Sequence, residues 1–84
     1  MPQPTSAQLG AAIRRLRSSR DLSIEDLAAA AEIHWTSVSR IENGRQNTGW
    51  EAVAKLAAAL EVEIGDLARL AAEEPGPDGD GSAV

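Results

Sequence analysis

The stretch LSIEDLAAAAEIHWTSVSRIENG, residues 22–44, decides the fold of this chain. It contains two short segments, about 24–30 and about 35–42, in which apolar residues recur at helical spacing. Ala31-Glu32-Ile33 lies between them and turns the chain. The sequence therefore predicts two short helices joined by a three-residue turn.

Residues that begin and end helices flank the two segments. Ser23 stands in front of the first segment as an N-cap, with Asp26 three residues later as its capping-box partner. Asn43-Gly44 follows the second segment, and both residues tolerate the left-handed conformation that ends helices. These signals limit both helices to about two turns.

The second of these helices has a narrow apolar face. Val38 and Ile41 are its only large apolar pair, whereas an ordinary core helix buries a broader stripe. Such a helix is about 12 Å long at about 1.5 Å per residue, which fits a DNA major groove about 12 Å wide. The remaining side chains lie off the apolar face and are predicted to be free for DNA: Trp35, Thr36, Ser37, Ser39 and Arg40.

Helical patterns continue on both sides of residues 22–44. Thr5-x-x-Gln8 is a capping box that opens a first helix, and Thr48-x-x-Glu51 is the same signal for a fourth. A fifth helix is predicted over about 64–73, with Leu67 and Leu70 facing inward. The sequence predicts an all-α, compact five-helix domain over residues 5–73. Residues 74–84, rich in Pro, Gly and Asp, are predicted to be a disordered acidic tail.

Composition and charge limit the possible partners. Cysteine is absent and no segment approaches the roughly 20 apolar residues of a membrane span, so we expect a cytoplasmic protein. The net charge of −5 argues against nucleic acid. However, residues 1–45 hold six arginines against five acids, while residues 46–84 hold two basic residues against eight acids. The acidity is therefore concentrated outside the segment with the two short helices.

Four blocks of the sequence together resemble the Cro/C1-type (XRE-like) helix-turn-helix family, over about residues 8–72. The blocks are Leu9-Gly10-x-x-Ile13-Arg14-x-Leu16-Arg17, Leu22-Ser23-x-Glu25-x-Leu27-Ala28, Val38-Ser39-Arg40-Ile41-Glu42-Asn43-Gly44 and Leu56-Ala57-x-Ala59-Leu60. The resemblance implies a lambda-repressor-like DNA-binding fold. It also implies a sequence-specific transcriptional regulator that reads double-stranded DNA, expected to act as a homodimer on a two-fold site.

The resemblance assigns roles residue by residue. The base-reading positions are Trp35, Thr36, Ser39 and Arg40, and a guanidinium at Arg40 can donate two hydrogen bonds to guanine. The expected phosphate-binding positions are His34, Ser37, Asn43 and Arg45, to which Ser23 and Arg14 are added. The resemblance further implies a structural ion pair between Arg17 and Glu42.

Three residues depart from the family pattern and keep a second interpretation open. Ile24 replaces a glutamine that usually binds phosphate, Glu32 replaces a glycine in the turn, and Trp35 replaces a polar residue that usually contacts bases. With the net charge, they favour an alternative in which the chain is a protein-interaction module, for example antitoxin-like, with weak or lost DNA binding. Trp50, Leu67 and Leu70 are candidates for core or dimer contacts. No residue pattern supports an enzyme, a metal site, a cofactor or a small-molecule effector.

Overall fold

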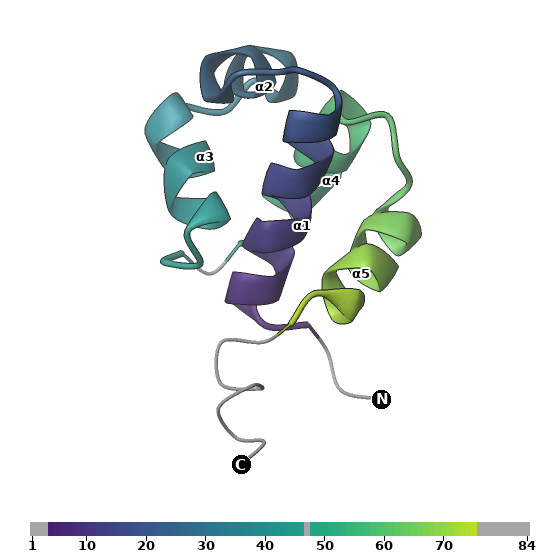
Figure 1. Cartoon of the computed structure of the whole chain (residues 1–84). Helices are drawn as coiled ribbons and strands as arrows, with labels where there is room; N and C mark the ends of the chain where they lie inside the picture. Colours follow the sequence, from purple (N-terminus) through teal and green to yellow (C-terminus); the bar gives the residue numbers. More distant parts are fainter. Residues whose placement is uncertain (1–3, 47, 76–84) are drawn as a thin grey trace.

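The computed structural model describes residues 4–46 and 48–75, and these residues form five helices without a strand (Figure 1). The helices are α1 (Ser6–Ser19), α2 (Ile24–Ala31), α3 (Trp35–Glu42), α4 (Trp50–Ala59) and α5 (Ile64–Glu73). The predicted all-α fold with five helices is confirmed. The bounds of α3 and α5 agree with those predicted, and α2 extends one residue beyond its predicted end.

The first two helices begin at the predicted capping boxes. The Gln8 backbone N–H donates to Thr5 Oγ1 at 3.1 Å, and the Thr5 N–H donates to Gln8 Oε1 at 2.9 Å. At α2 the Asp26 N–H donates to Ser23 Oγ at 2.9 Å, while the Ser23 N–H donates to Asp26 Oδ2 at 3.0 Å. The hydrogen bonds that the Asp26 carboxylate accepts from Ser23 lower the pKa of Asp26.

The predicted capping box at the start of α4 is wrong. The N-cap of α4 is Gly49, which makes no side-chain capping bond. The Thr48 hydroxyl donates instead to the Gln46 carbonyl at 3.4 Å. A threonine three residues before a glutamate is only a local pattern, and here the chain enters the helix one residue later than the pattern requires.

Every helix contributes a fully buried aliphatic side chain to one core. The set is Ile13 from α1, Leu27 from α2, Val38 and Ile41 from α3, Leu56 from α4, Leu60 at its end, and Leu67 from α5. Figure 1 shows α1 between α3 and α5, and α1 packs against both.

The predicted inward position of Leu70 is wrong, since this side chain is 37% exposed. Its α5 neighbour Leu67 faces the core as expected.

The packing of the domain extends past its predicted end at residue 73. Glu74 is only 8% exposed, and its carbonyl accepts a 2.7 Å hydrogen bond from Gln8 Nε2. Its carboxylate pairs with the Arg15 guanidinium at 3.1 Å. Glu74 therefore belongs to the packed domain, and the prediction that the tail starts at residue 74 is wrong. The rest of the predicted tail, residues 76–84, lies outside the described residues. Within the described residues, no helix is long and apolar enough to cross a membrane.

The backbone of α1 approaches the backbone of α3 closely at Gly10. A Cβ atom at this position would lie 2.1 Å from the Ile41 carbonyl oxygen and 2.7 Å from that of Glu42. These oxygens belong to the last turn of α3, whose backbone cannot move away without unpacking Ile41 from the core. Only glycine allows α1 to lie directly against the end of α3.

Gly10→Ala should therefore destabilise the domain. Adding a methyl group to a closely packed site typically lowers the free energy of unfolding by about 1–3 kcal/mol. Because the neighbours of this methyl group would be backbone atoms, which cannot rotate away, we expect a loss at or above the upper end of that range. The matched control is Gly65→Ala in α5, where an added Cβ meets nothing within 4 Å. That change should raise the free energy of unfolding by up to about 1 kcal/mol. Urea unfolding followed by circular dichroism measures both, and equal stability of Gly10→Ala and wild type would contradict the packing described.

Candidate nucleic-acid interface

A bidentate ion pair fixes the last turn of α3 to α1. Arg17 Nε lies 2.6 Å from Glu42 Oε2 and Arg17 Nη2 lies 3.0 Å from Glu42 Oε1, while Arg17 Nη1 donates to the Leu22 carbonyl at 2.8 Å. The Glu42 side chain is fully buried and the Arg17 side chain is 15% exposed. The hydrogen bonds to Glu42 raise the pKa of Arg17, so the guanidinium keeps its charge. The ion pair implied by the resemblance is present.

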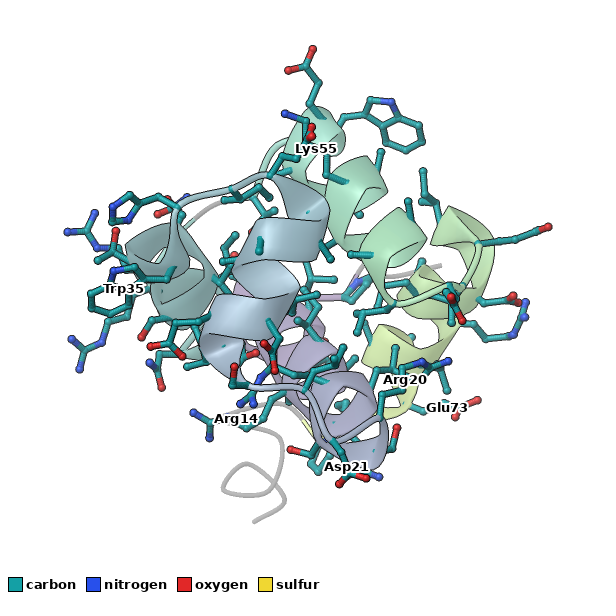
Figure 2. The ribbon with its side chains drawn as sticks, turned by 90° about the horizontal axis from the view of Figure 1, so that it is seen from above. Arg14, Arg20, Asp21, Trp35, Lys55 and Glu73 are labelled. Atoms are coloured by element: carbon teal, nitrogen blue, oxygen red, sulfur yellow. The ribbon has the colours of Figure 1, made fainter. Side chains whose placement is uncertain are left out.

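The opposite side of α3 is open to solvent. Val38 and Ile41 are buried beneath the helix, whereas Trp35 is 50% exposed and Arg40 is also exposed. Figure 2 shows Trp35 projecting from α3 away from the other helices. The three small polar side chains of this helix are half-buried, namely Thr36, Ser37 and Ser39. The structure thus leaves Trp35 and Arg40 exposed on α3, with three partly exposed polar side chains on the same helix.

The N-terminus of α3 is held by a histidine. His34 is the N-cap, and its Nδ1 accepts a 3.2 Å hydrogen bond from the Thr36 backbone N–H. The Thr36 hydroxyl oxygen lies 2.7 Å from the same nitrogen. The His34 and Trp35 rings are stacked with centroids 6.0 Å apart and an interplanar angle of 27°. Three of the predicted DNA-contacting residues therefore form one connected group.

A second group of predicted residues gathers at the C-terminal end of α3. The Asn43 amide donates to the Ser39 carbonyl at 2.9 Å, and its Oδ1 accepts a 3.4 Å hydrogen bond from Arg14 Nη2. Arg45 follows Gly44, whose φ of +69° turns the chain at the end of the helix. Arg14 comes from α1 and also lies 3.5 Å from Glu42, so the α1–α3 contact brings it beside Asn43.

The turn between α2 and α3 carries exposed negative charge. Glu32 is exposed in the left-handed conformation with φ of +59°, which costs a non-glycine residue about 1 kcal/mol. Ser23, predicted to bind phosphate, uses its hydroxyl to cap α2, and Asp26 occupies its backbone N–H. The hydroxyl and the backbone N–H of Ser23 are thus both engaged within the cap of α2, next to the Asp26 carboxylate.

Two features of the site do not follow from the residue assignments made on the sequence. One is the His34 cap with its contact to the Thr36 hydroxyl, and the other is the Arg14–Asn43 hydrogen bond. The first had a weak local signal, since histidine directly precedes the helix where Ser, Thr, Asp or Asn are usual. The second had none, because it joins residues 29 positions apart.

Comparison with known sequences gives a consistent result. The sequence model of a family described as a helix-turn-helix domain matches residues 8–70. An uncharacterized HTH-type transcriptional regulator of Mycobacterium tuberculosis is 41% identical over 61 residues, which is 73% of this chain and 24% of that protein. The chain therefore spans about a quarter of the length of this relative.

Known structures share the arrangement of helices. The clp gene regulator ClgR from Corynebacterium glutamicum superposes with a TM-score of 0.77 at 30% identity, covering 84% of this chain and 92% of ClgR. SinR, a master regulator for biofilm formation solved in complex with DNA, superposes with a TM-score of 0.67 at 28% identity. That match covers 70% of this chain and 95% of SinR.

The Arg17–Glu42 pair should contribute measurably to stability. Glu42→Gln keeps the shape of the side chain but removes its charge, leaving a partly buried guanidinium without a counter-ion. We expect a loss of about 2 kcal/mol in the free energy of unfolding, from charge-assisted hydrogen bonds in a buried position. Asp66→Asn, which breaks the exposed Asp66–Arg69 pair, is the control and should cost less than about 1 kcal/mol. Similar losses in the two variants, measured by urea unfolding, would contradict the anchoring role of Glu42.

Proposed function

The chain belongs to the helix-turn-helix domain family, and on that premise we propose that it is a DNA-binding transcriptional regulator that reads the major groove with α3. The observation that carries the proposal is the open outer face of α3, above the buried pair Val38 and Ile41. Its proposed place of action is the cytoplasm, which the absence of cysteine fits.

Base reading is assigned to the outer face of α3. Arg40 is exposed and on the last turn of the helix, where its guanidinium can donate two hydrogen bonds to guanine O6 and N7. Thr36 and Ser39 lie on the same helix and supply shorter polar groups. Trp35, half-exposed at the helix start, offers an apolar surface to a thymine methyl or a sugar.

Phosphate contacts are assigned to the two ends of α3 and to the neighbouring helices. His34 and Ser37 lie at the start of the helix, while Asn43 and Arg45 lie at its end, with Arg14 beside Asn43. Ser23 stands at the start of α2. Contacts of this kind fix the register of the protein on the duplex, so that the base-reading side chains meet the correct edges.

The specificity of binding tests the proposal. Selection from a random duplex pool should enrich a two-fold symmetric site. Arg40→Ala should then weaken binding to that site by about 10-fold or more and relax the choice of base at one position in each half. Arg69→Ala removes the same charge from α5, which lies across α1 from α3 in Figure 1, and should change affinity little. Fluorescence anisotropy at fixed salt measures all three affinities.

The same experiment separates the two functions that the sequence left open. If no sequence is enriched, or if binding does not weaken steeply between 50 and 200 mM salt, the proposed regulator is wrong. The protein-interaction alternative would then stand, and the exposed carboxylates of Glu25 and Asp26 in the first turn of α2 and of Glu32 before α3 would favour it.

We further propose that the chain acts as a homodimer. Trp50 at the start of α4 is 70% exposed and lines an apolar groove together with Pro4, Leu9, Val53, Ile64, Leu67 and Ala68. Leu67 itself is fully buried in the core, and Leu70, which is exposed on α5, lines a separate hollow with Leu16 and Arg15 rather than this groove. A two-fold contact through this surface would cover the tryptophan and allow two copies of α3 to read half-sites one helical turn apart.

Trp50→Glu tests the dimer. The variant should be monomeric at micromolar concentration, where the wild type should sediment as a dimer in analytical ultracentrifugation. Its unfolding free energy per monomer should change little, because the side chain makes few contacts within the domain. A dimeric Trp50→Glu protein would exclude this surface as the interface, and a monomeric wild type would exclude the dimer.

A further inference from the structure

The cap of α3 fixes which ring nitrogen of His34 carries a proton. A backbone N–H can only donate, and the Thr36 N–H is directed at His34 Nδ1 at 3.2 Å. Nδ1 must therefore present a lone pair to it. In the neutral ring the single proton then lies on Nε2.

The same geometry fixes the direction of the Thr36 hydroxyl. Its oxygen lies 2.7 Å from His34 Nδ1, which is shorter than the contact made by the backbone N–H. With the ring proton on Nε2, Nδ1 has one lone pair and no proton, so the hydroxyl is the donor in this contact and shares that lone pair with the Thr36 backbone N–H. A threonine hydroxyl has one proton and two acceptor lone pairs, so this contact leaves Thr36 with acceptor capacity alone.

The stacked Trp35 ring restrains the histidine. The rings of His34 and Trp35 lie 6.0 Å apart with 27° between their planes. The His34 ring is thus contacted from two sides, by the Thr36 backbone N–H that donates to it and by the Trp35 ring. The hydrogen-bonding polarity of Thr36 is set before any ligand arrives.

We infer that Thr36 reads DNA as an acceptor only, and so selects a base that carries an exocyclic amino group in the major groove. The amino groups available there are N6 of adenine and N4 of cytosine, whereas the edges of guanine and thymine offer acceptors at O6, N7 and O4. A free threonine hydroxyl would bond to either kind of edge. His34 is the positioning residue that removes this freedom. The inference rests on the proposed function and names the base specificity of the same site.

The test measures base preference at each position of the site selected by the full chain. Affinities for duplexes with all four bases at each position should show one position per half-site where adenine or cytosine is favoured about 5- to 10-fold over guanine and thymine. Thr36→Val, which keeps the shape but loses the acceptor, should abolish this preference and leave the other positions unchanged. Thr36→Ser, which keeps the hydroxyl, should retain it.

Variants of His34 test how the polarity is set. His34→Ala frees the threonine hydroxyl, so guanine or thymine should be accepted at that position while adenine and cytosine still bind. His34→Asn restores an acceptor at the cap and should restore the preference. His34 is also assigned a phosphate contact, so both variants can weaken binding uniformly. The readout is therefore the ratio between bases at one position, which a lost phosphate contact does not change.

The outcomes are distinguishable. If the wild type selects a site but no position changes its base preference in Thr36→Val, the inference is overturned and the proposed function stands. If Thr36→Val removes a preference that His34→Ala leaves intact, the threonine reads a base but His34 does not set its polarity, which also overturns the inference. If no site is selected at all, the proposed function fails and the inference fails with it.

Discussion

The Arg17–Glu42 ion pair, together with the contact at Gly10, holds α3 in the position on which the rest of the site depends. The guanidinium makes two hydrogen bonds to the buried carboxylate and a third to the Leu22 carbonyl, at the start of the segment that leads into α2. One side chain of α1 therefore ties together the chain before α2 and the end of α3. Gly10 lets the α1 backbone approach closely enough for this to happen.

This anchoring has an electrostatic consequence for the outer face. Glu42 belongs to α3, yet its charge is directed inward and neutralised by Arg17, with Arg14 also within 3.5 Å. The outward charges of α3 and its C-terminal end are those of Arg40 and Arg45. A chain with a net charge of −5 can thus present a locally basic surface. Glu32, exposed at the turn before α3, opposes this effect and is expected to limit the affinity for a phosphate backbone.

The sequence predicted what depends on local interactions. The capping boxes at Thr5 and Ser23 and the stop at Gly44 involve residues within a few positions of one another, and all three form. The prediction failed at one local signal, the capping box expected at Thr48, and at the tertiary contacts of Glu74. Glu74 is buried only because Gln8 and Arg15 on α1 bind it, and composition carries no information about such contacts.

In the candidate site, too, the features that depend on one helix were predicted, and those that depend on packing between helices or on ring orientation were not. The exposure of Trp35 and Arg40 followed from the narrow apolar face of α3, which is a property of one helix. Arg14 was placed among the expected phosphate contacts, but its position beside Asn43 is decided by how α1 crosses α3. The bond between the Thr36 hydroxyl and His34 depends on a ring orientation that residue types alone do not determine. The roles of these side chains toward DNA remain predictions.

The outer face of α3 is the surface proposed to contact DNA. A titration of the isotopically labelled chain with its selected duplex, followed through backbone amide chemical shifts, tests this proposal most directly. We expect the largest changes over residues 34–45, smaller ones near Ser23, and little change along the part of α5 that faces away from α3. Changes concentrated on α4 and α5, with α3 unaffected, would contradict it.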